Sequence, residues 1–130
     1  MQTKVKKKHL ILSPTFERAD ARGLFHEVLN EGKWETLLSG RMKANAVMGN
    51  HYHKTTTVFF YLTSGSVTIK TIHVESKEQD QFTLRANQGV ILPPNESHVV
   101  CFLEPSDFIM LKSQRYISEH SDTFHFPVSE

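Results

Sequence analysis

Three histidines are spaced so that their side chains could meet at one point. His51 and His53 stand two residues apart, and residues at i and i+2 of an extended strand project from the same face. His98 follows the turn at 93–95 and begins another apolar segment, which can neighbour the first strand in a closed barrel. Neutral imidazoles ligate metals and act as general bases near neutral pH. The spacing therefore predicts one shared pocket that either binds a metal or moves a proton.

Short apolar segments separated by turn residues are expected to position these histidines. The segments are rich in Val, Ile, Phe, Tyr and Thr, as half-buried strands are. The predicted strands cover residues 9–12, 24–29, 34–38, 44–48, 58–62, 67–74, 81–84, 90–92, 98–103 and 108–111. No long amphipathic helix is expected, although a short helical turn could form near 16–21. The prediction is one domain over 1–130, with a core barrel at about 20–114 and a tail at 115–130.

The composition is that of an ordinary globular domain. The chain has 130 residues, of which 38% are hydrophobic and 22% charged, enough for one core. A formal net charge of +1 gives no large basic field, so no nucleic acid partner is expected. No apolar stretch approaches the roughly 20 residues that cross a bilayer, and residues 1–9 lack the apolar region of a signal peptide. No membrane partner is therefore expected. Cys101 is the single cysteine, so no disulfide can form within the chain, and a cytoplasmic location is expected.

The residues around the histidines resemble the two motifs of the cupin superfamily. Gly49-Asn50-His51-Tyr52-His53 resembles the first motif, in which a His-x-His pair precedes a glutamate and then a glycine. Val58, seven residues before Gly65, stands at the glutamate position. The stretch from Gly89 to His98 resembles the second motif, with Asn95 in a glycine place; Asn tolerates positive φ better than most residues. The resemblance implies an all-β, single-domain double-stranded β-helix, a jelly-roll barrel.

A cupin metal site usually combines three histidines with one glutamate. Val58 cannot ligate, but His51, His53 and His98 with water could still bind Zn²⁺, Fe²⁺ or Ni²⁺. The resemblance then implies a metal-dependent oxygenase or hydrolase. A third alternative is a non-catalytic module that binds or senses a small molecule, because a fold does not determine a function.

A second resemblance is to cupins that act on sugar nucleotides. The segment from Asp20 to Glu27 resembles the Asp-x-Arg-Gly-x-Phe-x-Glu segment of deoxysugar-nucleotide 3,5-epimerases. The segment from Gly49 to Lys54 resembles the Gly-x-His-x-His-Lys stretch of dTDP-sugar 3,4-ketoisomerases and of capsule-biosynthesis cupins. This resemblance implies an isomerase or epimerase that acts on a nucleotide-linked keto-deoxysugar and requires no cofactor. The valine at position 58 favours this metal-free branch.

The second resemblance also implies a role for each matching residue. His51 would remove the proton beside the keto group, with His53 as its partner. Tyr116 resembles a tyrosine that follows the last barrel strand in the ketoisomerases and would join the catalytic group. Arg22 would contact the diphosphate, because a guanidinium suits phosphate oxygens. The implied substrate-binding residues are Arg22, Phe25, Glu27 and Lys54.

Two further expectations come from single residues. Phe59 and Phe60 are adjacent, so one of them should face away from the barrel interior and leave an apolar outer surface. Such a surface favours a homodimer, the commonest homo-oligomer. His9 has no partner that the sequence identifies, and a surface position or a satisfied core position is expected for it.

Overall fold

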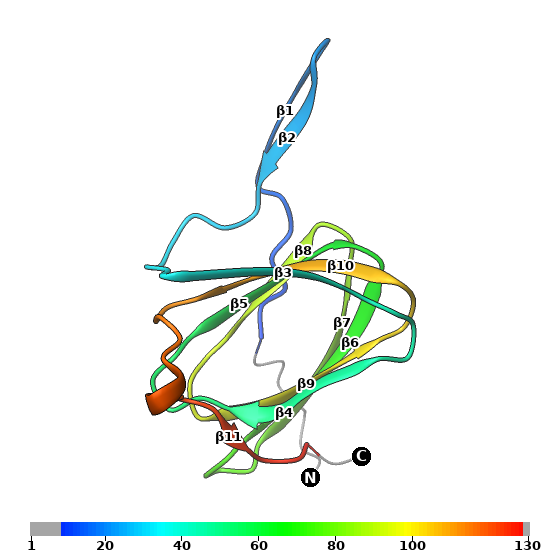
Figure 1. Cartoon of the computed structure of the whole chain (residues 1–130). Coiled ribbons are helices and arrows are strands. Elements are labelled where there is room, and N and C mark those ends of the chain that lie inside the picture. Colours follow the sequence, from blue (N-terminus) through cyan, green and yellow to red (C-terminus); the bar gives the residue numbers. More distant parts are fainter. Residues whose placement is uncertain (1–8, 129–130) are drawn as a thin grey trace, which may run out of the picture.

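The structure is a computed structural model and describes residues 9–128. Most strands form two antiparallel sheets that curve around one core (Figure 1). Their bounds are β3 (Thr36–Met42), β4 (Val47–Tyr52), β5 (Val58–Ser64), β6 (Ser66–His73), β7 (Gln79–Arg85), β8 (Gln88–Leu92), β9 (Glu96–Phe102), β10 (Ser106–Lys112) and β11 (Phe124–His125). One sheet has the order β3-β10-β5-β8 and the other β11-β4-β9-β6-β7. This arrangement confirms the predicted all-β jelly-roll barrel.

Strand alternation produces the core. On β7, Asp80, Phe82 and Leu84 are buried while the residues between them are exposed, as expected for a strand with one face on the core. Strand β9 is buried on both faces along most of its length. The core cluster consists of Val58, Phe60, Leu62, Val67, Ile69, Phe82, Leu84, Val90, Leu92, Val100, Phe102 and Phe108. Both sheets contribute to it, so the histidine-bearing strands rest on a rigid scaffold.

The first elements form a separate hairpin, and the helical turn predicted near 16–21 is wrong. Strand β1 (Phe16–Asp20) pairs with β2 (Gly23–Glu27), and Figure 1 shows this hairpin projecting from the barrel. The Asp20 carboxylate accepts a hydrogen bond from the backbone N–H of Arg22 at 2.9 Å. That local bond is typical of an Asx turn, which favours a hairpin over a helix.

The remaining ends of the chain are nearly without regular structure. The strand predicted at 9–12 is reduced to a bridge between Leu12 and Gly89. In the tail, a 3₁₀ helix spans Ser118–His120 and β11 joins the sheet beside β4. Between residues 9 and 128, no helix is long and apolar enough to cross a membrane.

Both members of the Phe59–Phe60 pair are buried within the chain. Phe60 is fully buried in the core, and Phe59, on the opposite face, is only 4% exposed. Trp34 and Tyr61 cover Phe59, with ring centroids at 6.4 and 6.1 Å. The apolar outer surface expected at this pair is therefore wrong, because the chain covers it with its own aromatic side chains. The hairpin carries three of the exposed large apolar residues instead.

His9 is a satisfied core residue. Its Nδ1 lies 2.7 Å from the Asp80 carboxylate and its Nε2 lies 2.6 Å from the Glu96 carboxylate. All three side chains are buried. Burial alone lowers the pKa of His9, but the hydrogen bonds to Glu96 and Asp80 outweigh it, and the pKa is raised. His9 therefore fastens the segment before β1 to the strands β7 and β9.

Candidate functional site: a histidine cavity beside the C-terminal segment

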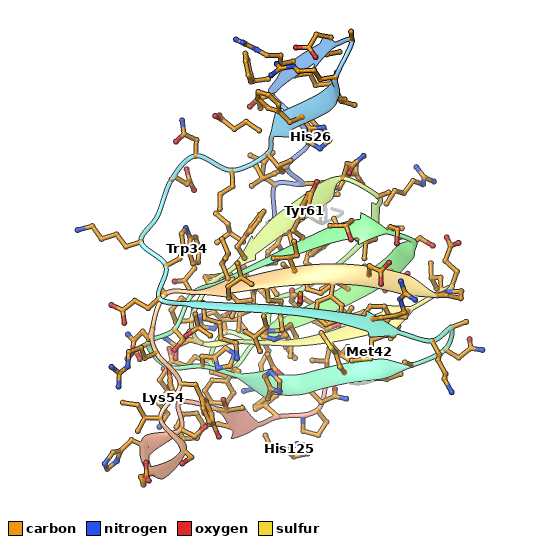
Figure 2. The ribbon with its side chains drawn as sticks, turned by 45° about the horizontal axis from the view of Figure 1, so that its top comes forward. His26, Trp34, Met42, Lys54, Tyr61 and His125 are labelled. Atoms are coloured by element: carbon orange, nitrogen blue, oxygen red, sulfur yellow. The ribbon has the colours of Figure 1, made fainter. Side chains whose placement is uncertain are left out.

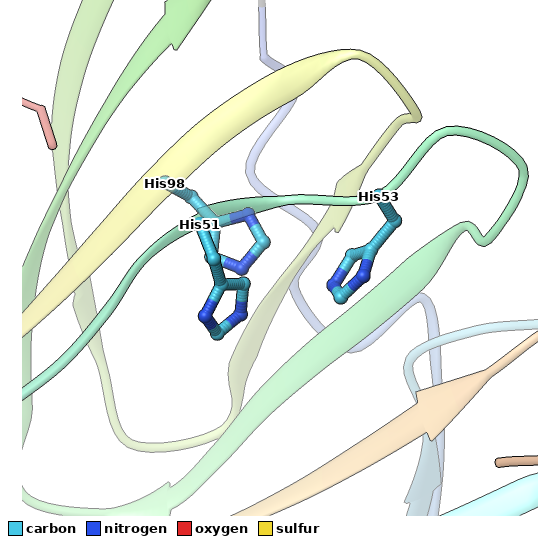
Figure 3. Close-up of side chains that lie close together, drawn as sticks. All are labelled: His51, His53 and His98. Atoms are coloured by element: carbon cyan, nitrogen blue, oxygen red, sulfur yellow. The ribbon is translucent and has the colours of Figure 1, made fainter. Parts of the chain in front are cut away.

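Three imidazoles line a cavity of about 110 Å³ within the barrel. Their ligand nitrogens lie within 4.8 Å of one another, and the ring centroids of His51 are 5.2 Å from His53 and 4.9 Å from His98. Figure 3 shows the three rings gathered from β4, the loop after it and β9. Val58 lies in the same wall. The structure thus brings together the histidines that the sequence singled out, with valine at the vacant glutamate position.

A bulge in β4 aims His51 into this cavity. Gly49 pairs with Val99 and His51 pairs with His98, so Asn50 is the additional residue between them. Gly49 and Asn50 have φ values of 115° and 63°, which ordinary residues rarely adopt. A side chain on Gly49 would place its Cβ 2.5 Å from the carbonyl oxygen of His98. Such bulges re-orient a side chain at a site. Here Gly49 and Asn50 allow the bulge that turns His51 toward the cavity.

The second motif forms the turn that was expected from its sequence. Asn95 has a φ of 64°, in the region that favours glycine, and its N–H donates to the carbonyl of His53 at 2.7 Å. The turn before β9 is thereby tied to the loop after β4. The two motifs hold each other in register.

The three histidines are neutral at pH 7. Burial and the neighbouring imidazoles lower the pKa of His98 to about 3. Burial, with the nearby His53 and Lys112, lowers the pKa of His51 to about 4. Burial lowers the pKa of His53 as well. Each ring therefore offers an unprotonated nitrogen that can accept a proton, accept a hydrogen bond or ligate a metal.

Lys112 is a residue of this cavity that the sequence analysis missed. It lies opposite Val58 in the β10–β5 register and lines the histidine cavity. Burial lowers the pKa of its ammonium, and among the described residues no carboxylate forms an ion pair with it. Met110 lies two residues before it on β10 and lines the cavity as well, as expected for two side chains on one face of a strand.

The residues present fit a divalent metal in geometry but not in charge. Three clustered imidazoles are a common zinc donor set. Within the described chain, however, the cluster contains no carboxylate, and the ammonium of Lys112 shares the cavity. Like charges in a partly buried site repel strongly. The charge of this cavity therefore opposes a bound divalent cation.

A wider cavity of about 240 Å³ adjoins the first and shares His53 and Lys112 with it. Its other lining residues are Thr56, Gln114, Arg115, Tyr116, Ile117, His120, Asp122 and Thr123. Most of these belong to the C-terminal segment. Tyr116 therefore lies in the outer cavity, where it is 64% exposed, and not against the histidine trio. The site has a small inner chamber and a wider outer chamber with basic groups.

Four residues that the resemblance assigned to the substrate do not line either cavity within one chain. Arg22, Phe25 and Glu27 lie on the projecting hairpin (Figure 1). The Arg22 side chain is 81% exposed and pairs with Asp20 at 2.7 Å. Lys54, labelled in Figure 2, places its ammonium 4.4 Å from the ring centroid of Phe124.

The fold and the paired histidine motifs define a jelly-roll barrel of the cupin class. Residues 18–124 match the model of the polysaccharide biosynthesis C-terminal domain, and the chain belongs to this family. No curated protein sequence matched the chain.

Several solved structures share the fold. CapF of Staphylococcus aureus, described as a capsular polysaccharide assembling protein, is 23% identical, with a TM-score of 0.69 over 87% of this chain. This chain spans about a third of CapF, 34% of its length. A dTDP-4-dehydrorhamnose 3,5-epimerase from Bacillus anthracis str. Ames is 19% identical, with a TM-score of 0.73 over 87% of this chain and 76% of the epimerase. A 3,4-ketoisomerase from Helicobacter canadensis is 18% identical, with a TM-score of 0.75 over 92% and 91%.

Proposed function

We propose that this chain is an isomerase or epimerase that acts on a nucleotide-linked keto-deoxysugar by histidine-mediated proton transfer. The observation that carries the proposal is the inner cavity, which three neutral imidazoles line together with a half-buried ammonium that has no carboxylate partner among the described residues. The imidazoles can accept a proton from a substrate, and the ammonium favours a negative charge that develops on that substrate. Similar folds include a 3,5-epimerase with TDP and PPi bound and a 3,4-ketoisomerase, which supports this choice of substrate class.

The proposed reaction begins at the C–H bond beside the sugar ketone. His51 accepts the proton, and the electron pair of the broken bond forms an enolate whose oxygen carries the negative charge. The Lys112 ammonium stabilises that oxygen, as a fixed positive charge in a partly dry site does. The negative enolate also favours the protonated state of His51, which offsets its low basicity in the free cavity. Returning the proton to another face or carbon completes an epimerisation or isomerisation.

The proposal assigns the outer chamber to the remainder of the substrate. The cavity of about 240 Å³ can take the bulkier part, and Arg115 on its wall suits a diphosphate. Tyr116 lines this chamber, from where its hydroxyl would reach a substrate that protrudes from the inner cavity. No cofactor is required by this chemistry.

A homodimer is part of the proposal, on grounds that differ from those of the sequence. The projecting hairpin exposes Phe16, Leu24 and Phe25 by 47%, 59% and 58%. A lone two-stranded hairpin is marginally stable in water, so packing against a second copy would stabilise it. Arg22 would then reach the partner's site and contact the diphosphate there. The cytoplasmic location stays a prediction from the single cysteine.

The direct test is solvent deuterium exchange into dTDP-4-keto-6-deoxyglucose, observed by NMR. We expect exchange beside the ketone that persists in EDTA. Exchange that EDTA abolishes and one divalent ion restores would support a three-histidine metal enzyme instead. Absence of exchange with any 4-keto nucleotide sugar would contradict the enzyme and favour a binding module.

A further inference from the structure

Asp122 holds the C-terminal segment against the loop that carries His53. Its carboxylate accepts hydrogen bonds from the backbone N–H groups of Lys54, Thr55 and Thr56 at 2.8, 2.9 and 2.9 Å. The hydroxyl groups of Thr55 and Thr56 add two more, at 2.9 and 2.8 Å. Five donors on one carboxylate are an unusually complete set for a mostly exposed loop, since hydrogen bonds to a charged acceptor are the strong ones.

The backbone of the same residue contacts the site. The carbonyl oxygen of Asp122 lies 2.6 Å from Nδ1 of His53. A carbonyl can only accept a hydrogen bond, so Nδ1 must carry the proton. In a neutral imidazole the other nitrogen, Nε2, is then the acceptor. The position of the Asp122 backbone therefore decides which nitrogen of His53 can receive a hydrogen bond or a proton.

We propose that Asp122 is the positioning residue of this site: its carboxylate fixes the segment, and its carbonyl fixes His53 as the Nδ1–H tautomer. The inference of a catalytic consequence rests on the proposed function, whereas the tautomer itself does not. Orienting partners of this kind set the tautomer and ring orientation of functional histidines in many sites. Without these contacts of Asp122, the His53 ring could take the Nε2–H tautomer. It would then present a hydrogen-bond donor where the reaction needs an acceptor.

The tautomer can be read without a substrate. Long-range ¹H–¹⁵N correlation spectra of the histidine rings at pH 7.5 distinguish the two tautomers of His53. We expect Nδ1–H in the unmodified protein and a shift toward Nε2–H, or a mixture, in Asp122→Ala. Asp122→Asn keeps one side-chain oxygen to accept from the loop and should retain most of the Nδ1–H form. Asp107→Ala is the matched control, because it removes a carboxylate that is bonded to Arg41 and Ser64.

The second measurement is the exchange reaction of the proposed function. Asp122→Ala should lower kcat by about 10–100-fold, the usual effect of losing an orienting partner, and change KM by less than about threefold. Asp122→Asn should recover most of kcat, and Asp107→Ala should leave it unchanged. A variant that merely loosened the fold would instead lower the thermal midpoint and both parameters, with the tautomer unchanged in the folded fraction.

Several outcomes would overturn the inference. An Nε2–H tautomer of His53 in the unmodified protein would do so at once. An Nδ1–H tautomer that survives in Asp122→Ala would also overturn it. If Asp122→Ala does not fold, Asp122→Ser takes its place, because a single hydroxyl cannot accept from the five donors that the carboxylate holds. A tautomer population and a kcat that stay unchanged in Asp122→Ser would count against the inference. If no exchange occurs in any variant, the proposed function fails while the tautomer spectra still decide the role of Asp122.

Discussion

Lys112 on β10 lies directly opposite Val58 on β5. The position at which the cupin motif has glutamate is thus apolar, and the neighbouring strand brings an ammonium to the same cavity. A glutamate would give this corner a negative charge that attracts a cation. The pair found here gives it a positive charge, which favours an anionic group of a ligand or of a reaction intermediate.

Removing this charge provides the first prediction. Lys112→Met keeps the length of the side chain and loses the ammonium, so kcat should fall by about 10²–10³-fold, as when one oxyanion donor is lost. The pKa of His51 should rise, because Lys112 is one of the groups that lower it. Exchange kinetics and an NMR titration measure both effects. Lys33→Met, at an exposed lysine, is the control, and equal kinetics for the two variants would contradict the role.

Replacing the proposed base gives the second prediction. His51→Gln retains some hydrogen bonding but cannot accept the proton, so kcat should fall by about 10²–10⁴-fold. Substrate binding should change little, since the larger part of the substrate lies in the outer chamber. Exchange rates and calorimetric titration with the substrate separate the two. His73→Gln, at the end of β6, should leave both near the original values; exchange unchanged by His51→Gln would refute the assignment.

Acid should destabilise the fold through the buried histidines. In the unfolded chain His51 and His98 take up protons below about pH 6.5, whereas folding lowers their pKa values to about 4 and 3. The unfolded state therefore binds more protons between these limits, and the free energy of unfolding falls as the pH falls from 6.5 toward 4. Each histidine contributes a slope of at most about 1.4 kcal/mol per pH unit.

Urea unfolding at several pH values checks this slope. In His51→Gln the decline between pH 6.5 and 4.5 should be shallower than in the unmodified protein. An identical slope in the two proteins would show that the pKa of His51 does not differ between the folded and the unfolded state.

His9 acts in the opposite direction. Its pKa is raised in the fold because the hydrogen bonds to Glu96 and Asp80 outweigh the effect of burial. Its stabilising contribution is thus complete below pH 6.5 and is lost as the pH rises through the folded pKa. His9→Gln should lower the free energy of unfolding at pH 6 by about 3 kcal/mol, the lower end for breaking a buried ion pair. His120→Gln at the exposed 3₁₀ helix should change the free energy of unfolding little. Equal losses in the two variants would contradict a stabilising role for the contacts of His9 with Asp80 and Glu96.

The hairpin leads to a prediction about association. Sedimentation at micromolar concentration should give a dimer mass for the unmodified protein. Phe25→Asp places a charge on the exposed apolar face of β2 and should shift the mass to that of a monomer, with the barrel's circular dichroism retained. Leu103→Asp, at another exposed apolar residue, is the matched control. A monomer mass for the unmodified protein would refute the dimer.

Local patterns predicted the barrel and the histidine trio because they depend on short spacings. The i, i+2 relation of His51 and His53 is a property of any strand, and the glycine and asparagine positions mark the bulge and turn that aim His51 and His98. Lys112 was missed because its place opposite Val58 depends on the pairing of two distant strands. Asp122 was missed because its contact with His53 spans 69 residues, a distance over which sequence periodicity carries no information.

The same long separation has a kinetic consequence. Closing a loop costs more entropy as the loop lengthens, and barrels dominated by distant contacts fold in milliseconds to seconds. The bond from Asp122 to His53 also needs β4 and its following loop in place before it can form. On refolding from denaturant, we expect the far-ultraviolet signal of the sheets to return first and the exchange activity to return in a later phase. A refolding chain would therefore pass through a form with native sheets that is inactive until residues 116–125 close over its histidines.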